Sequence, residues 1–198
     1  LSLTQDRPWA PGVDNNVVGT PIVASAELET AVTRELGYFE VALRGSAGRT
    51  VYGPSTLAGG TVVDNSAQNT WRAATGLRVG YEVTPILTAF VDGSAGYQLY
   101  DLPSPIYLEK LDAADYAIRT GLNAQWTSIL EAEGSIGLGL RRFAAPALGE
   151  VVSTLYDAKL TFRPDETVTV GATLSTVIGA PGPSSGGLAR VAYAAAAD

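Results

Sequence analysis

The stretch that decides the fold runs from Trp71 to Leu99 and reads WRAATGLRVGYEVTPILTAFVDGSAGYQL. Every second residue from Trp71 to Tyr81 is uncharged, the residues between them are small or charged, and the alternation resumes from Leu87 after a break at 83–85. A period of two indicates extended strands, because successive side chains point to opposite faces. Each uncharged row runs about ten residues, which is the length that a tilted strand needs to cross a bilayer. The stretch therefore predicts a transmembrane β-hairpin.

The rest of the chain repeats this pattern. Eight full strands are expected, each with one face that carries no Asp, Glu, Lys or Arg, at residues 22–32, 39–47, 71–81, 87–99, 114–126, 130–140, 152–162 and 168–178. Residues 1–6 are expected to be the end of a further strand, and the last stretch after 186 begins another. The prediction is about nine strands in all.

The connections between these strands alternate between short and long. The short turns are expected at 34–37, 83–85, 127–128 and 164–166. The long loops are expected at 7–20, 53–65, 101–112, 142–150 and 179–186. The loop 101–112 has room for a helical turn. Outer-membrane barrels show this asymmetry, with tight periplasmic turns and longer outer loops.

Aromatic side chains on the uncharged rows fall in two bands, which are typical of the two membrane interfaces. They are Phe39, Tyr81, Trp126 and Phe162 near the short turns, and Trp71, Tyr97, Tyr116 and Tyr156 near the long loops. The pattern predicts an all-β fold, an antiparallel up-and-down transmembrane β-barrel. Residues 1–198 form a single domain, as a whole barrel or as part of a larger one. A soluble antiparallel sandwich would show the same alternation, but it would not predict the loop asymmetry or the two bands.

Three stretches resemble the porin-like outer-membrane β-barrel family of Gram-negative bacteria. They are VTRELGYFEVALRGSAGRTVY (32–52), LRVGYEVTPILTAFVDGSAGYQLYD (77–101) and YDAKLTFRPDETVTVGATLS (156–175). The resemblance covers most of the chain, from about Ala24 to Ile178, and it implies a barrel in the bacterial outer membrane. Members of the family are usually longer, with a signal peptide and a last strand that ends in an aromatic residue, so the resemblance implies an incomplete chain.

Charged residues gather on the opposite face of the strands, which is the candidate lumen. The candidate lumen-facing charges are Glu27, Glu29, Glu40, Arg44, Arg72, Arg78, Asp92, Asp115, Arg119, Glu131, Glu133, Asp157 and Lys159, with Glu82, Arg141 and Arg163 on the same rows. Arg72 and Arg78 are expected to pair across strands with Glu40 or Asp92. Two interpretations stay open: a charged pore wall that sets ion preference, or a salt-bridged filling of a narrow barrel. The near-balance of signs argues against strong ion selection.

The composition argues against catalysis and against nucleic acid. The chain has 198 residues, a net charge of −7, and neither His nor Cys. Nucleic-acid binding needs a basic surface, and the absence of His removes the usual general base. Two carboxylate pairs, Glu27 with Glu29 and Glu131 with Glu133, have the residue types of a glycosidase acid and base, but charged lumen walls routinely contain such groups. We therefore expect no enzyme, no cofactor and no metal.

The expected function is porin-like passive passage of ions or small hydrophilic solutes through the outer membrane. The alternative is a structural or anchoring barrel with a closed lumen that binds another component of the cell envelope. A soluble β-sandwich binding module is the third reading of the pattern. The expected partners are the lipid bilayer, the solutes, and an envelope protein or a second copy of the chain.

Overall fold

The computed structural model describes residues 2–5, 17–105, 107–164, 168–179 and 190–197. Strands dominate it, and only two short 3-10 turns, η1 and η2, interrupt them in the described part. The elements are β1 (Ser2–Gln5), β2 (Val17–Gly19), β3 (Ile22–Leu36), β4 (Phe39–Tyr52), β5 (Ser55–Leu57), β6 (Val62–Val63), η1 (Ser66–Gln68), β7 (Thr70–Thr84), β8 (Leu87–Tyr100), β9 (Ala113–Trp126), β10 (Leu130–Phe143), η2 (Pro146–Leu148), β11 (Glu150–Phe162), β12 (Val170–Gly179) and β13 (Arg190–Ala197).

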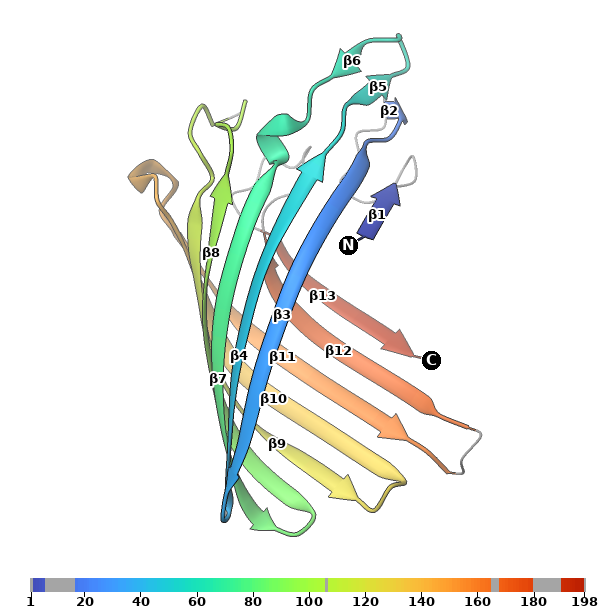
Figure 1. The fold of residues 1–198 in the computed structure, drawn as a ribbon, viewed down its shortest axis with the longest axis vertical. Helices are drawn as coiled ribbons and strands as arrows, with labels where there is room; N and C mark the ends of the chain where they lie inside the picture. Colours follow the sequence, from blue (N-terminus) through green and yellow to red (C-terminus); the bar gives the residue numbers. More distant parts are fainter. Residues whose placement is uncertain (1, 6–16, 106, 165–167, 180–189, 198) are drawn as a thin grey trace.

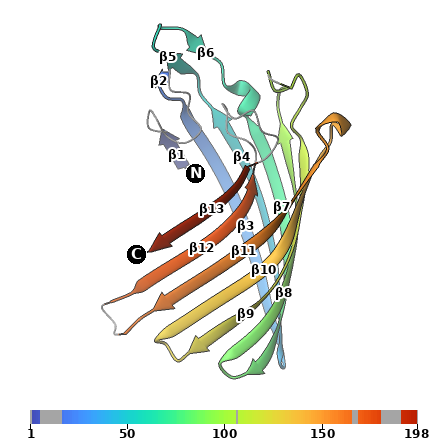
Figure 2. The same ribbon diagram turned by 180° about the vertical axis from the view of Figure 1, so that it is seen from behind.

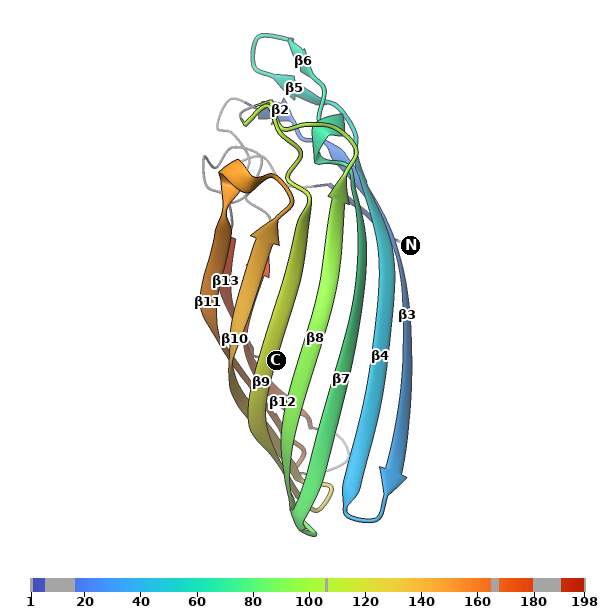
Figure 3. The same ribbon diagram turned by 90° about the vertical axis from the view of Figure 1, so that its left-hand side faces the viewer.

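Ten strands form one sheet in the order β1-β3-β4-β7-β8-β9-β10-β11-β12-β13. Every pair is antiparallel, so the sheet is a meander of hairpins. The sheet is strongly curved, with β3 and β4 on one side and β11 to β13 on the other (Figures 1 and 2). Seen from the convex side, β4, β7, β8, β9 and β10 run side by side, and β12 and β13 lie behind them (Figure 3). The prediction of an antiparallel up-and-down sheet is confirmed.

The sheet is not closed. Within the residues that the structure describes, β1 and β13 are its two edges, and they do not pair with each other. The sequence prediction of about nine strands is close to the ten observed, because the short β1 joins β3 through Ser2↔Ser25 and Gln5↔Ile22. An open, curved, antiparallel wall is consistent with part of a barrel.

The short turns lie together at one end of the sheet and the longer connections at the other (Figure 1). The asymmetry expected from the sequence is therefore present in the described connections. At the long-loop end, β2, β5 and β6 form a separate three-stranded sheet, so the expected loop 53–65 contains two short strands. In the described part of the loop 101–112 no helix forms, but the backbone N–H of Leu108 donates to the carbonyl of Ser104 at 2.8 Å, which closes a single turn of the helical type. No helix in the described chain is both long and apolar enough to span a membrane.

Several predicted boundaries were wrong by a few residues. The turn expected at 34–37 is at Gly37 and Tyr38, because β3 continues through the polar residues that suggested a turn. Similarly, β7 continues through an irregular pairing between Glu82 and Thr84, so the turn falls at Pro85 and Ile86. The strands extend beyond the apolar band, and their last residues are therefore polar. Polar residues and a nearby proline are also typical of turns, so the sequence predicted the turns too early.

The remaining boundary differences are small. The turn after β9 takes in residues 127–129, β10 runs on to Phe143, and β12 begins at Val170. Much of the loop predicted at 7–20, most of the turn at 164–166 and nearly all of the loop at 179–186 lie outside the described residues.

Candidate functional site: the inner wall of the sheet

The two faces of the sheet differ as the alternation predicts. On one face, large apolar side chains are exposed, with exposed fractions of 48% for Leu77, 49% for Val91, 58% for Ile118 and 57% for Leu138. The charged rows lie on the opposite face, where Asp92 is buried. A soluble core would bury the first row and expose the second. The apolar row thus faces outward, and we call the opposite, charged face the inner wall.

The outer face carries both aromatic bands. All eight aromatic residues predicted for the bands are exposed. In the band near the short turns the rings of Phe39 and Tyr81, which are cross-strand partners, lie 5.1 Å apart. In the other band the guanidinium of Arg49 lies 5.1 Å from the ring of Trp71 and donates to both carboxylate oxygens of Asp101. These hydrogen bonds hold the pKa of Asp101 below its ordinary value.

On the inner wall, Arg44 of β4 donates a hydrogen bond to Asp92 of β8. The two strands are not neighbours, because β7 lies between them. The arginine crosses β7 at Gly76, which pairs with Arg44 on one side and with Ser94 on the other. A residue without a side chain at this point leaves room for the guanidinium to lie along the wall.

The second crossing joins Arg119 of β9 to Asp157 of β11, with 2.8 Å between Nε and the carboxylate oxygen Oδ2. It passes over Gly137, the cross-strand partner of Arg119. A Cβ on Gly137 would lie 2.1 Å from the carbonyl oxygen of Ile118 and 2.7 Å from Cγ of Arg119. Only glycine fits this close approach. Asp157 also accepts from the backbone N–H of Thr176 at 3.4 Å, so the carboxylate links β9, β11 and β12.

The longest crossing joins Arg78 of β7 to Glu133 of β10 through two hydrogen bonds of 3.0 and 2.8 Å. The guanidinium carbon lies 3.5 Å from the ring centre of the buried Phe90, an arrangement typical of a cation–π contact. The ring itself lies over Gly121, where a Cβ would come within 2.6 Å of the ring carbon Cζ. Asn123 donates to the same carboxylate at 3.3 Å. A bidentate pair of this kind is both strong and directional.

At the long-loop end of the wall, Arg141 of β10 donates to both carboxylate oxygens of Asp115 at 3.2 and 3.1 Å. Its other terminal nitrogen donates to Oε1 of Gln98 at 2.9 Å. The side chain is buried, and its Nε has no hydrogen-bond partner in the described part of the protein. Three adjacent strands, β8, β9 and β10, are thus held together by one arginine.

The pairing predicted from adjacent strands was wrong. Arg78 pairs with Glu133 and Asp92 pairs with Arg44, because long arginine side chains reach beyond the neighbouring strand. No ion pair joins Arg72 or Glu40 to another residue that the structure describes. The same holds for Glu27, Glu29 and Glu82 on the inner wall.

Three inner-wall residues were not among the predicted site residues: Phe90, Gln98 and Asn123. The available signal was the alternation itself: Phe90 and Gln98 fall on the face of β8 opposite to Val91, and Asn123 falls on the face of β9 opposite to Leu122.

The pairing between β11 and β12 covers only the part near the short turn, from Phe162↔Val170 to Ala158↔Leu174. Beyond it, the buried Thr176 hydroxyl accepts from the backbone N–H of Tyr156 at 3.2 Å and donates to its carbonyl at 2.9 Å. The Thr176 side chain thereby takes the place of the backbone hydrogen bonds that would otherwise join β12 to Tyr156 of β11.

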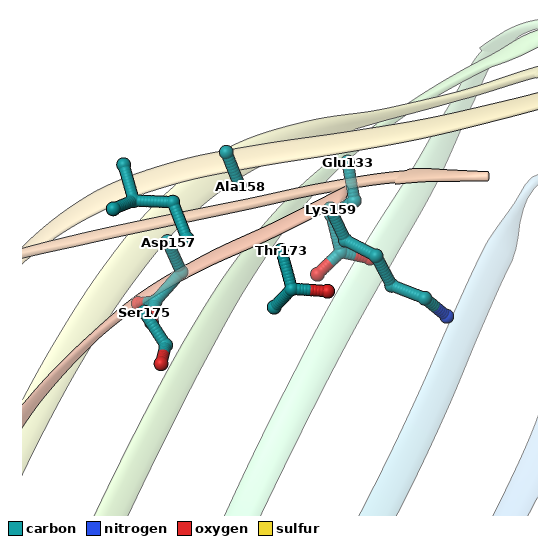
Figure 4. Close-up of a pocket in the computed structure, with 7 residues that line it drawn as sticks. Glu133, Asp157, Ala158, Lys159, Thr173 and Ser175 are labelled. Atoms are coloured by element: carbon teal, nitrogen blue, oxygen red, sulfur yellow. The ribbon is translucent and has the colours of Figure 1, made fainter. Parts of the chain in front are cut away.

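A recess of about 110 Å³ lies beside this irregularity. Its wall includes Lys159 and Thr173 on the concave side, whereas Ala158 points away (Figure 4). The recess has room for a few water molecules, whose share of liquid volume is about 30 Å³ each. It is too small for a typical organic ligand, whose pockets span roughly 300–1,000 Å³. We interpret it as solvated wall.

The two carboxylate pairs lie in different surroundings. Glu131 approaches Nζ of Lys159 at 4.0 Å and Glu133 is bound by Arg78, whereas Glu27 and Glu29 lie exposed near the edge of the sheet. No group of three metal-ligating side chains forms among the residues with described positions.

A family model described as "Putative beta-barrel porin 2" matches residues 1–198. The chain belongs to this porin family. Neither the search of curated proteins nor the search of solved structures returned a match. The family agrees with the resemblance seen in the hairpin sequences, and it identifies the curved sheet as wall of a porin-like β-barrel. In porin-like barrels the polar and charged rows of the strands line the lumen.

Proposed function

We propose that this porin lies in the outer membrane of a Gram-negative bacterium and lets ions and small hydrophilic solutes pass passively along its inner wall. The observation that carries the proposal is the placement of exposed apolar side chains and of ion-paired charges on opposite faces of one sheet. A continuous apolar face of this extent is suited to hydrocarbon, and a charged one to a water-filled lumen. The family supports the porin-like barrel, and the aromatic bands support the membrane setting.

The proposal involves no catalytic step. Three arginines of the wall, Arg44, Arg78 and Arg119, are each engaged with a carboxylate. Ion pairs that cross several strands stiffen the wall and hold its shape. Side chains engaged in this way fit a structural part of a passage better than they fit a catalytic site.

We further propose a mild preference for cations. The basic groups of the wall are mostly paired, whereas Glu27, Glu29 and Glu40 have no ion-pair partner in the described chain. Unpaired carboxylates attract cations into a water-filled passage whose walls have a low dielectric constant. The expected reversal potential in a KCl gradient is therefore small and of the cation-selective sign. The double variant Glu27→Gln/Glu29→Gln should move it toward zero.

The decisive experiment is conductance of the full native chain in planar lipid bilayers. Discrete current steps are expected, and their size should rise in proportion to salt concentration, as for a water-filled passage. Protease protection in vesicles reports insertion separately. A protein that inserts and gives no steps would contradict passage and favour the closed barrel that anchors an envelope component.

A further inference from the structure

The sheet contains a seam between β11 and β12, in the half of these strands nearer the long loops. Backbone pairing between the two strands stops at Ala158↔Leu174. Beyond this pair, β11 stays paired with β10, and β12 stays paired with β13, up to the long-loop end of each strand. Both strands are therefore intact, although they no longer pair with each other. We call this unpaired stretch, residues 150–157 of β11 and 175–179 of β12, the lateral seam.

Backbone groups of β11 are open along the lateral seam. The Thr176 hydroxyl binds both the N–H and the carbonyl of Tyr156, so these two groups point toward β12. Alternate residues of an antiparallel strand direct their backbone groups to the same side, so those of Val152 and Thr154 point toward β12 as well. Among the residues that the structure describes, no strand pairs with them on that side, and the carbonyl of Thr154 accepts a hydrogen bond from the hydroxyl of its neighbour Ser153 at 3.3 Å.

The lateral seam reaches the apolar band of the outer face. Val152 lies opposite Leu140, and Leu140 lies opposite Tyr116 of the long-loop aromatic band. Val152 and Tyr156 are both exposed on this face. Within a bilayer, a backbone polar group that nothing satisfies is costly. Water must therefore reach the open groups from the inner wall, which makes the lateral seam a polar break beside apolar side chains.

On the inner side, the recess of about 110 Å³ adjoins the lateral seam, and Lys159 and Thr173 line it from β11 and β12 (Figure 4). Glu133 and Asp157 also line it, but each of these carboxylates is already bound by an arginine. The Lys159 side chain is 59% exposed, and its Nζ approaches Glu131 at 4.0 Å, which makes a weak pair. Of the charged groups that line the recess, the ammonium of Lys159 is the least engaged.

We propose that the lateral seam binds an amphiphile with one apolar chain and a small anionic head, such as a long-chain carboxylate. The chain passes through the seam and lies against Val152 and Tyr156 on the outer face. The head lies in the recess, where Lys159 and the hydroxyl of Thr173 bind it. The recess is too small for a whole ligand, but a carboxylate displaces only a few water molecules from it. The proposal rests on the membrane placement in the proposed function and not on conductance.

Hydrogen exchange of the full chain in lipid tests whether the lateral seam exists in the membrane. The amides of Ala158 and Leu160 point toward the paired part of β12, and those of Val152 and Thr154 point toward the seam. Relative to their intrinsic rates, the amides of Val152 and Thr154 should exchange at least about a hundredfold faster than the other two, because exposed backbone groups open more readily. Equal protection of the two pairs would overturn the seam.

A long-chain carboxylate that carries a photoreactive diazirine in its chain tests the ligand. In vesicles that contain the full chain, adducts should concentrate on residues 150–156 and 172–176. They should be several-fold fewer at Leu77 and Val91, which lie on the apolar face of β7 and β8. The corresponding long-chain alcohol should show no such concentration, because its head is neutral. Even labelling of the apolar face by the carboxylate, or equal labelling of the seam by the alcohol, would overturn the proposal.

The two lysines of the chain give a matched test of the head, since Lys159 lies at the recess and Lys110 in a long loop. Lys159→Gln should weaken binding of the carboxylate at the lateral seam about fivefold, as expected for the loss of one charge-assisted hydrogen bond. Lys159→Arg should retain most of the binding, and Lys110→Gln should change nothing. Unchanged binding in Lys159→Gln would overturn the assignment of the head. A chain that conducts but labels evenly would overturn this site alone, whereas a chain that inserts and labels at the seam without current steps would contradict only the proposed passage of solutes.

Discussion

Among the glycines that the structure describes, Gly137 of β10 leaves the least room for a Cβ, and alanine there should be poorly tolerated. The added Cβ would lie 2.1 Å from the carbonyl oxygen of Ile118 and 2.8 Å from Cα of Arg119. Both neighbours are at or next to the backbone of β9, so no flexible side-chain end can simply move away. The strands themselves must separate.

The size of the effect follows from this geometry. Real Cβ atoms essentially never come closer than 3.0 Å, so β9 and β10 must part by about 0.9 Å near Gly137. That displacement lengthens the ladder hydrogen bonds beside it, and each is worth about 1 kcal/mol. Overpacking of a tight site costs roughly 1–3 kcal/mol. We expect Gly137→Ala to lower the free energy of unfolding by about 2–3 kcal/mol.

The same strand provides a matched control. Gly134 has nothing within 4 Å of the position a Cβ would take, so Gly134→Ala makes the same chemical change without the clash. Alanine there should be neutral or stabilising by up to about 1 kcal/mol, because glycine loses more conformational entropy on folding. Urea unfolding in detergent micelles, followed by tryptophan fluorescence, measures both variants. Equal stability of the two would refute the close approach.

Three further predictions test the assignment of the two faces, the Arg78–Glu133 ion pair of the inner wall, and the Arg49–Asp101 ion pair at the long-loop end. Leu77→Arg should make membrane insertion less favourable by about 2–4 kcal/mol, because it places a charge in the apolar band, whereas Thr88→Arg on the inner wall should be tolerated. Insertion into vesicles measures both variants, and equal tolerance would contradict the assignment of the two faces. In a double-mutant cycle, Arg78→Ala and Glu133→Ala should show a coupling of about 1–2 kcal/mol, since charge-assisted hydrogen bonds lose part of their strength when partly exposed; a coupling near zero would show that the pair is only incidental. The pKa of Asp101 is lowered by its hydrogen bonds from Arg49, so its stabilisation is present above the ordinary value of 3.8 and is lost as the pH falls through the lower pKa of the folded state. The protection of amides at the start of its loop against hydrogen exchange, relative to their intrinsic rates at each pH, should fall as the pH falls through this range, and Asp101→Asn should abolish this pH dependence. Unchanged protection in the native chain would contradict the contact.

Much of the fold could be predicted because alternate residues of a strand point to opposite faces, so the difference between the faces appears as a period of two in the sequence. The rows that hold Leu77 and Val91 are uncharged at every second position, and that period gives both the strands and the outward face. The boundaries were less certain at Glu82 to Thr84, where a β-irregularity and a proline resemble a turn. Sequence alternation does not show such irregularities, because they depend on the partner strand.

The sequence alone determined that this chain is a β-meander with an apolar outer row, a charged inner row and unequal connections, because each of these properties follows from local periodicity and turn residues. Only the tertiary structure decided which charges meet. Arg78 passes its neighbouring strand and reaches Glu133, and Arg119 crosses at Gly137, since the reach of an arginine depends on curvature and on the small residues beneath it. The burial of Arg141, which binds Asp115 and Gln98 of two other strands, likewise depends on contacts between residues far apart in the chain, and no periodic pattern records them.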